Sequence, residues 1–294
     1  MRVWVALPQQ DDAWQRVKNL EVDAPFAHEV RTDAQGNEFL YLSATNPAPG
    51  PVSVVTTFTV ERDEALFDAR AENTRPLTDA ERQDLSAHLQ ADQHVVIDDR
   101  IRDLASEIVG AESNPVAAAR RIYDWTLENV DYWVKDPQNK KASPVGSTEY
   151  CLTTRTGNCT DFHSLYASLA RASGIPTQIV YGSFFKESLD GVTDADQSYH
   201  CWIEFYAPEL GWVPLDVAVA DIFVGDFPFD DTTRKGVTLT TADGYTGAEP
   251  EKVEYYFGNL EERRGAGKRG GGLVLDPAPP AGAPHTLAQR PPPR

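Results

Sequence analysis

The chain has 294 residues, of which 41% are hydrophobic and 24% are charged, and this ordinary composition excludes a fibrous repeat and a wholly disordered chain. Its 27 Lys and Arg residues face 45 Asp and Glu residues, so the formal net charge of −18 repels phosphate backbones and anionic membrane surfaces. We therefore expect neither nucleic acid nor a membrane as a partner. A cationic partner, such as a lysine-bearing protein or a small polyamine, would be attracted.

The sequence contains no stretch of about 18 apolar residues that could span a bilayer, and the N-terminus MRVWVALPQQ lacks the long apolar core of a secretory signal. Strand-like alternation begins with Val3 and Val5, at the very start of the sequence, which is consistent with a missing upstream segment. We expect a soluble protein that is exported or periplasmic if such a segment precedes it, and cytoplasmic otherwise. The three cysteines are too few for a disulfide scaffold, and their odd number leaves at least one thiol free.

The N-terminal region, up to about residue 65, is expected to be an antiparallel β region. Short runs with alternating apolar residues, such as RVWVAL, EFLYLSA and PVSVVTTFTV, are separated by the turn sequences DAQGNE and NPAPGP. Because only half of each run is apolar, one face of the sheet should be buried, as in a sandwich layer. We predict a β-rich domain over residues 1–75.

Helical signals begin at Thr78, which could form a capping box with Glu81, and recur at Asn114, a helix cap followed by a first-turn proline. Apolar residues at helical spacing predict two amphipathic helices. Their stripes are Ile101, Leu104, Ala105 and Ile108, and then Ala119, Ile122, Tyr123, Thr126, Leu127 and Val130. We predict an α+β domain over residues 76–265, followed by a flexible Gly/Pro-rich tail over 266–294.

The segment GNCTDFHSLYASLARASGIP places Cys159 where a glycine-containing loop meets a helix, which Gly174 and Pro176 end. Strand-like SYHCWIEFYA follows, with His200 and Trp202 on one face and Cys201 on the other. GWVPLD, which ends at Asp216, is expected to be the neighbouring strand.

These residues fit nucleophilic catalysis by a thiol. A helix N-terminus lowers the pKa of a cysteine, because unsatisfied N–H groups and the helix dipole favour the thiolate. His200 would then be the base for Cys159, and Asp216 would fix the tautomer of the imidazole. The Cys159 backbone N–H is the first candidate donor to the oxygen of a tetrahedral intermediate.

The chain resembles the transglutaminase-like superfamily. The resemblance is carried by the segments RTGNCTDFHSLYASLARASGIPTQIVYG and YHCWIEFYAPELGWVPLD, together with WVALP, GNEFLYL and YYFGNLEERR. The chain is most similar to bacterial members with a β-rich N-terminal region. The resemblance implies a papain-like α+β core with Cys159 as nucleophile, His200 as base and Asp216 as the orienting acid. Asn158, Trp202 and Tyr132 are then candidates for substrate contacts or oxyanion donors. The sequence departs from the family at GGLVLDPAPPAGAP, where a further strand is usual.

The resemblance implies acyl transfer from protein or peptide amides through a thioester on Cys159, resolved by an amine or by water, with no cofactor. A cysteine peptidase or amidase with the same triad is the alternative within enzymes, and a non-catalytic binding protein on this scaffold is the alternative outside them.

Other chemistry-bearing residues have simpler interpretations. Cys201 is expected to point away from the His200 face as a core residue, and Cys151 to be another core residue or to pair with Cys201 in an oxidising compartment. His163 is expected to have a structural role, because the metal-ligand spacings are absent. The loop that carries Asp190, Asp194 and Asp196 lacks the full EF-hand pattern, so a solvated loop is favoured over a calcium site.

Overall fold

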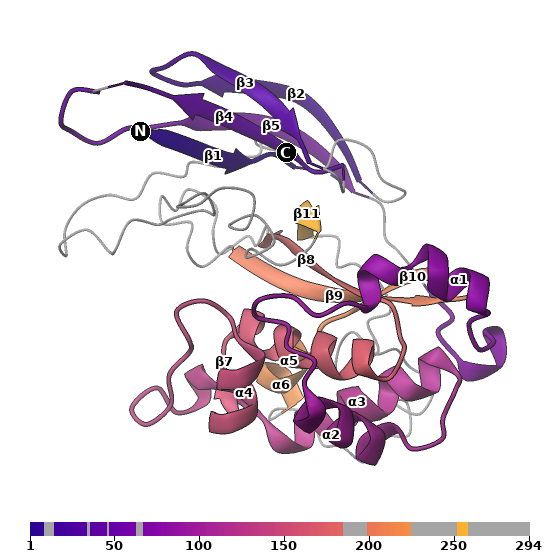
Figure 1. Cartoon of the computed structure of the whole chain (residues 1–294). Helices are drawn as coiled ribbons and strands as arrows, with labels where there is room; N and C mark the ends of the chain where they lie inside the picture. Colours follow the sequence, from indigo (N-terminus) through magenta and orange to yellow (C-terminus); the bar gives the residue numbers. More distant parts are fainter. Residues whose placement is uncertain are drawn as a thin grey trace. The chain divides into compact units, whose positions relative to one another are not determined.

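The computed structural model shows an α+β protein, as the sequence predicts, and most of its helices and strands are labelled in Figure 1. It describes residues 1–8, 15–33, 36–45, 47–62, 67–184, 199–224 and 252–257. The chain divides into two units. One unit comprises Met1–Glu64, Tyr181–His200 and Pro250–Arg294, and the other comprises Ala65–Val180 and Cys201–Glu249.

The N-terminal residues form two small antiparallel sheets. The first has the order β1 (Arg2–Ala6), β4 (Glu38–Ser43), β3 (His28–Thr32), and the second pairs β2 (Gln15–Asp23) with β5 (Val55–Arg62). Alternate residues point inward, so Leu40 and Leu42 of β4 are fully buried. They share a core with Val5 of β1, and Leu20 and Val22 of β2 pack against it. The sandwich-like arrangement predicted for this region is confirmed.

Two helices of the second unit begin where the sequence signals at Thr78 and Asn114 predict. Thr78 and Glu81 form a capping box at α1 (Asp79–Asp84). Asp98 caps α2 (Asp99–Val109), and the Asn114 side chain accepts hydrogen bonds from the first turn of α3 (Pro115–Asn129). The described residues also include the 3-10 helices η1 (Ala71–Asn73), η2 (Ser86–Leu89) and η3 (Trp133–Lys135).

Helix α5 (Cys159–Ala172) is the central helix of this unit, since it contacts α2, α3, α4 (Thr148–Thr154) and α6 (Val217–Val224). Every residue of α5 from Asp161 to Arg171 is buried. The sequence predicts only one apolar stripe on this helix, and the difference arises because helices pack around it on several sides. A helix held in this way gives its first residue, Cys159, a fixed position.

A four-stranded sheet has the order β10-β9-β8-β11. Its strands are β8 (Thr177–Phe184), β9 (Tyr199–Ala207), β10 (Gly211–Leu215) and β11 (Lys252–Phe257). Strands β9 and β10 are antiparallel, with Ile203 opposite Leu215. This confirms the predicted hairpin, and β10 leads directly into Asp216.

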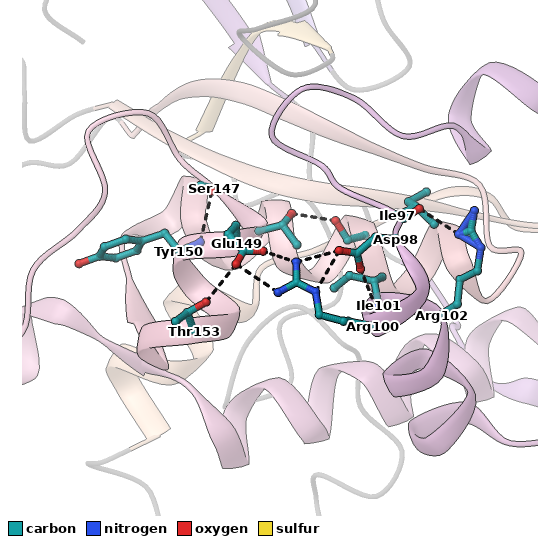
Figure 2. A network of polar contacts seen from close by, with 11 residues as sticks. Ile97, Asp98, Arg100, Ile101, Arg102, Ser147, Glu149, Tyr150 and Thr153 are labelled. Carbon is teal, nitrogen blue, oxygen red and sulfur yellow. Dashed lines mark hydrogen bonds and ion pairs between the residues drawn. The ribbon is translucent and has the colours of Figure 1, made fainter.

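A surface network joins the start of α2 to α4 (Figure 2). The Arg100 guanidinium donates to Asp98 Oδ2 at 2.7 Å and to Glu149 Oε2 at 2.5 Å. The Arg100 side chain is 60% exposed, so water and salt screen both ion pairs, and they should add little to stability.

Three predictions fall partly or wholly outside the described residues. The loop with Asp190, Asp194 and Asp196 and the tail over 266–294 lie outside them, and the division at residues 75 and 265 stays a prediction. Over the described ranges, no helix combines the length and apolar character needed to cross a bilayer.

Candidate active site

Cys159 is the first residue of α5, and a capping box fixes the helix at this point. The Asn158 side chain accepts a hydrogen bond from the Asp161 N–H at 3.1 Å, and the Asn158 N–H donates to Asp161 Oδ2 at 3.0 Å. The predicted junction of loop and helix at Cys159 is therefore confirmed. Cys159 is partly exposed, in contrast to the buried Cys151 and Cys201.

The Asp161 carboxylate is fully buried and connects the start of α5 to the loop that precedes α4. Its two oxygens accept hydrogen bonds from the Ser143 N–H at 3.0 Å, from the Ser143 hydroxyl and from the Ser147 N–H at 2.8 Å. Burial raises the pKa of Asp161, and the hydrogen bonds from Ser143 and Asn158 oppose the rise. Asp161 therefore ties the loop at Ser143 and Ser147 to the start of α5, beside Cys159.

Two glycines allow these segments to approach each other. A Cβ atom on Gly157 would lie 2.3 Å from Asp161 Cβ, and one on Gly146 would lie 2.2 Å from Thr160 Cγ2. Neither space can hold a methyl group. Gly146 also has a φ of +69°, a conformation that residues with a side chain rarely adopt.

Tyr132 lies beside the nucleophile, where its phenol oxygen accepts a hydrogen bond from the Cys159 N–H at 3.3 Å. Two short parallel strands, β6 (Asp131–Tyr132) and β7 (Thr156–Gly157), pair Tyr132 with Gly157 and bring it to this position. Burial raises the pKa of Tyr132, and the neighbouring Cys159 adds to the rise. The phenol therefore stays neutral and keeps a proton that it can donate.

Asp221 of α6 secures Tyr132 from the other side. Its carboxylate is buried and accepts hydrogen bonds from the Tyr132 N–H and from Lys135 Nζ, both at 2.7 Å. Burial raises the pKa of Asp221, and the hydrogen bond from Lys135 opposes the rise.

Asp216 is 1% exposed at the end of β10, where its Oδ1 accepts a hydrogen bond from the Val219 N–H at 3.0 Å and caps α6. The same oxygen lies 3.5 Å from Nε2 of His163, a fully buried residue one turn after Cys159. His200 is buried on β9, the strand that pairs with β10. The roles of His200 and Asp216 as base and orienting acid stay predictions.

Cys201 lies closer to the nucleophile than the sequence predicts. It is buried, as expected of a core residue, but its Sγ is 3.7 Å from Thr160 Oγ1 and 3.4 Å from His163 Nδ1. The reason is that the first turn of α5 packs against the face of β9 that carries Cys201. Cys151, Cys159 and Cys201 form no disulfide with one another.

Residues 102–217, which contain Cys159, His200, Asp216 and Tyr132, match the model of the transglutaminase-like superfamily. This part of the chain is a transglutaminase-like domain. The superfamily membership inferred from the sequence motifs is thus confirmed.

Proteins similar to this chain fit that assignment. An uncharacterized protein of Haemophilus influenzae is 27% identical over 237 residues, which cover 74% of this chain and 63% of that protein. A protein-glutamine gamma-glutamyltransferase of Pseudomonas aeruginosa is 28% identical over 121 residues, or 40% of this chain and 18% of that enzyme. The chain thus spans less than two thirds of either relative. Together with the family match, these relatives support a cysteine-dependent enzyme.

A solved structure shows the same fold as the transglutaminase-like domain and its N-terminal region. It is a protein of Cytophaga hutchinsonii for which cysteine protease activity is suggested. The two chains are 21% identical with a TM-score of 0.57, and the match covers 87% of this chain and 75% of that one.

The remaining predicted site residues of the transglutaminase-like domain have defined positions. Asn158 caps α5, and Trp202 is 1% exposed on β9, while their substrate roles stay predictions. Sequence reasoning missed Asp161 and Asp221. The capping-box pattern NCTD signals Asp161, and a lone acid in the apolar run VAVADIFV signals Asp221. Across the described ranges, the His, Cys, Asp and Glu side chains form no group that could hold a metal ion.

Proposed function

We propose that the transglutaminase-like domain transfers acyl groups from protein or peptide amides through a thioester on Cys159. The Cys159 thiolate attacks the amide carbonyl, the tetrahedral intermediate expels the amine, and an incoming amine or water releases the acyl group. The observation that carries this proposal is the position of a partly exposed Cys159 at the capped N-terminus of α5, with its N–H directed at the Tyr132 phenol.

His200 is assigned as the base that accepts the thiol proton and later protonates the leaving amine, and Asp216 as the acid that orients it. Support comes from the pairing of β9, which carries His200, with β10, whose last residue, Leu215, directly precedes Asp216. Both the His200 and the Asp216 side chains are buried, and hydrogen bonds are stronger in the protein interior than in bulk water.

Tyr132 is assigned as an oxyanion donor together with the Cys159 N–H. Its phenol is neutral, and its oxygen already lies 3.3 Å from that N–H, so both donors can reach the same substrate oxygen. Asn158 and Trp202 remain candidates for substrate contacts.

The acyl donor is proposed to be a protein or peptide glutamine amide, since the Pseudomonas aeruginosa relative is a protein-glutamine gamma-glutamyltransferase. The net charge of −18 favours a cationic amine as acceptor. Hydrolysis is the second candidate, because cysteine protease activity is suggested for the Cytophaga hutchinsonii protein of the same fold.

Thiol labelling tests the nucleophile. The full chain is treated with stoichiometric iodoacetamide at neutral pH, and the modified peptides are identified by mass spectrometry. Cys159 should be alkylated well before Cys151 and Cys201, both of which are buried. Equal labelling of Cys159 and Cys201, or full activity of Cys159→Ala on a verified substrate, would contradict the mechanism.

A fluorescent primary amine and casein distinguish the reactions. Amine incorporation that His200→Gln and Cys159→Ala abolish indicates transfer, whereas ammonia or new peptides without incorporation indicate an amidase or a peptidase. Casein binding that survives both substitutions, with no product of any kind, would favour a non-catalytic binding protein.

A further inference from the structure

Two of the three cysteines meet at the start of α5. Cys159 Sγ lies 3.9 Å from Thr160 Oγ1, and Cys201 Sγ lies 3.7 Å from the same oxygen. A second thiol therefore lies beside the proposed nucleophile, on the strand that carries His200.

The two thiols differ in how accessible they are to an oxidant. Cys159 is partly exposed, whereas Cys201 is 1% exposed. Burial raises the pKa of Cys201 well above its ordinary value, and the neighbouring Cys159 adds to the rise. A peroxide would therefore react first at Cys159, because oxidation follows exposure and thiolate character.

Cys201 has a proton acceptor of its own. His163 Nδ1 is 3.4 Å from Cys201 Sγ, and Nε2 of the same ring faces Asp216 Oδ1 at 3.5 Å. All three side chains are buried. When Cys201 attacks a neighbouring sulfur, its proton can pass to His163, and the Asp216 carboxylate stabilises the imidazolium that results.

We propose that Cys159 and Cys201 form a reversible disulfide under hydroperoxides, with Cys201 as the resolving thiol that protects the nucleophile from irreversible oxidation. In the first step, the Cys159 thiolate attacks the peroxide O–O bond, which gives the sulfenic acid and releases hydroxide. In the second step, Cys201 attacks the sulfenic sulfur, the S–S bond forms, and the sulfenic oxygen leaves as water with the Cys201 proton. Thiol reductants reverse the reaction by exchange.

This inference rests on the proposed function only for its effect on activity, since the disulfide itself can be detected without a substrate. The full chain is treated with hydrogen peroxide, and intact mass, free thiols and non-reduced peptide maps are measured. The expected product has lost two hydrogens and two of its three thiols, contains a peptide linking Cys159 to Cys201, and returns to the starting mass with dithiothreitol.

In the Cys201→Ser variant, Cys159 should instead gain two oxygen atoms, which dithiothreitol should not remove. Cys151→Ser is the matched control, because Cys151 is also a buried thiol but lies on α4. It should form the same Cys159–Cys201 link as the unmodified chain. A link through Cys151, or stable oxygen addition to Cys159 in the unmodified chain, would overturn the proposal, and so would thiols that survive excess peroxide.

His163→Gln keeps Cys201 and so remains informative if Cys201→Ser does not fold. It should slow disulfide formation severalfold and prolong the sulfenic acid, which dimedone traps. An unchanged rate would exclude His163 as the proton acceptor. If the disulfide forms but no acyl-transfer or hydrolase activity exists, the oxidation pair stands and the proposed function fails.

Discussion

Two groups of carboxylates have opposite surroundings in this chain. Asp161 and Asp221 are both buried. Asp161 accepts a hydrogen bond from the N–H of Asn158, the residue before Cys159, and Asp221 accepts one from the Tyr132 N–H. Glu81 and Glu149 lie at the surface, where they pair with Arg75 and Arg100. The buried acids hold the active-site segments together, whereas the surface acids contact groups that water could replace.

The two environments differ in what a substitution leaves behind. Removal of a buried acceptor leaves backbone N–H donors without a hydrogen-bond partner, because water cannot reach them. The cost is the full desolvation free energy of each donor. Removal of an exposed acid lets solvent take its place, and the ion pair it made was already screened. Substitutions should therefore separate the two groups clearly.

The largest effect is expected for Asp161→Ala, which leaves the Ser143, Ser147 and Asn158 N–H groups without their acceptor. We expect a loss of about 4 kcal/mol in the free energy of unfolding, measured by urea denaturation. Glu81→Ala is the matched control, because Glu81 occupies the same capping-box position of α1 at the surface. If both variants unfold at the same urea concentration, the buried anchoring role of Asp161 is wrong.

The next largest effect is expected for Gly157→Ala, since the new methyl group would lie 2.3 Å from Asp161 Cβ. Such overpacking should destabilise the protein by about 3 kcal/mol and shift the start of α5. Gly211→Ala is the comparison: this glycine has a φ of +79° and nothing within 4 Å of the added atom, so only backbone strain of about 1 kcal/mol is expected. A Gly157 variant as stable as the Gly211 variant would contradict the steric argument.

The sequence predicts those features that depend on neighbouring residues. The capping box of Thr78 and Glu81, the Asn114 cap and the β9–β10 hairpin are all present, because each is specified within a few residues. The position of Cys159 at the start of a helix follows from the same local signals.

Contacts across long sequence separations could not be predicted in this way. Asp221 accepts from a backbone N–H 89 residues earlier, and Asp161 from Ser143, 18 residues earlier. The contacts of His163 with Cys201 and Asp216 depend on how α5 packs against β9, which periodicity does not specify. Alternation correctly separates Cys201 from His200 along the strand, but it cannot tell which face meets the helix.

An intermediate effect, on activity alone, is expected for Tyr132→Phe, which removes the hydroxyl that accepts from the Cys159 N–H. We expect kcat to fall by roughly 100-fold with little change in stability, as for the loss of one oxyanion donor. Tyr166→Phe is the reverse case, since its buried hydroxyl donates to the Ala119 carbonyl at 2.9 Å. That variant should lose about 1 kcal/mol of stability and keep its kcat. Equal kcat values for the two variants would remove Tyr132 from the mechanism.

A small effect is expected for Arg100→Gln, which breaks the network shown in Figure 2. The urea midpoint should stay close to that of the unmodified chain, and the difference should vanish in high salt. Arg171→Gln tests the contrast, because this buried guanidinium donates to the carbonyls of Thr177 at 3.0 Å and Gln90 at 2.8 Å. A larger loss for the Arg100 variant would reverse the comparison between buried and exposed charges.

The smallest effect is expected in the pH dependence contributed by Glu81. The hydrogen bond from Arg75 and those from Thr78 lower its pKa from 4.5 to about 2, so the folded state binds its proton less tightly than the unfolded chain does. Its contribution to stability is therefore complete above pH 4.5 and is lost as the pH falls toward 2. Urea midpoints measured between pH 3 and 5 should fall less steeply in Glu81→Gln than in Glu72→Gln, which removes an exposed acid paired with Arg70. Identical slopes would show that the capping box of α1 does not favour the ionised acid, and the surface carboxylates would then contribute even less than the comparison with Asp161 assumes.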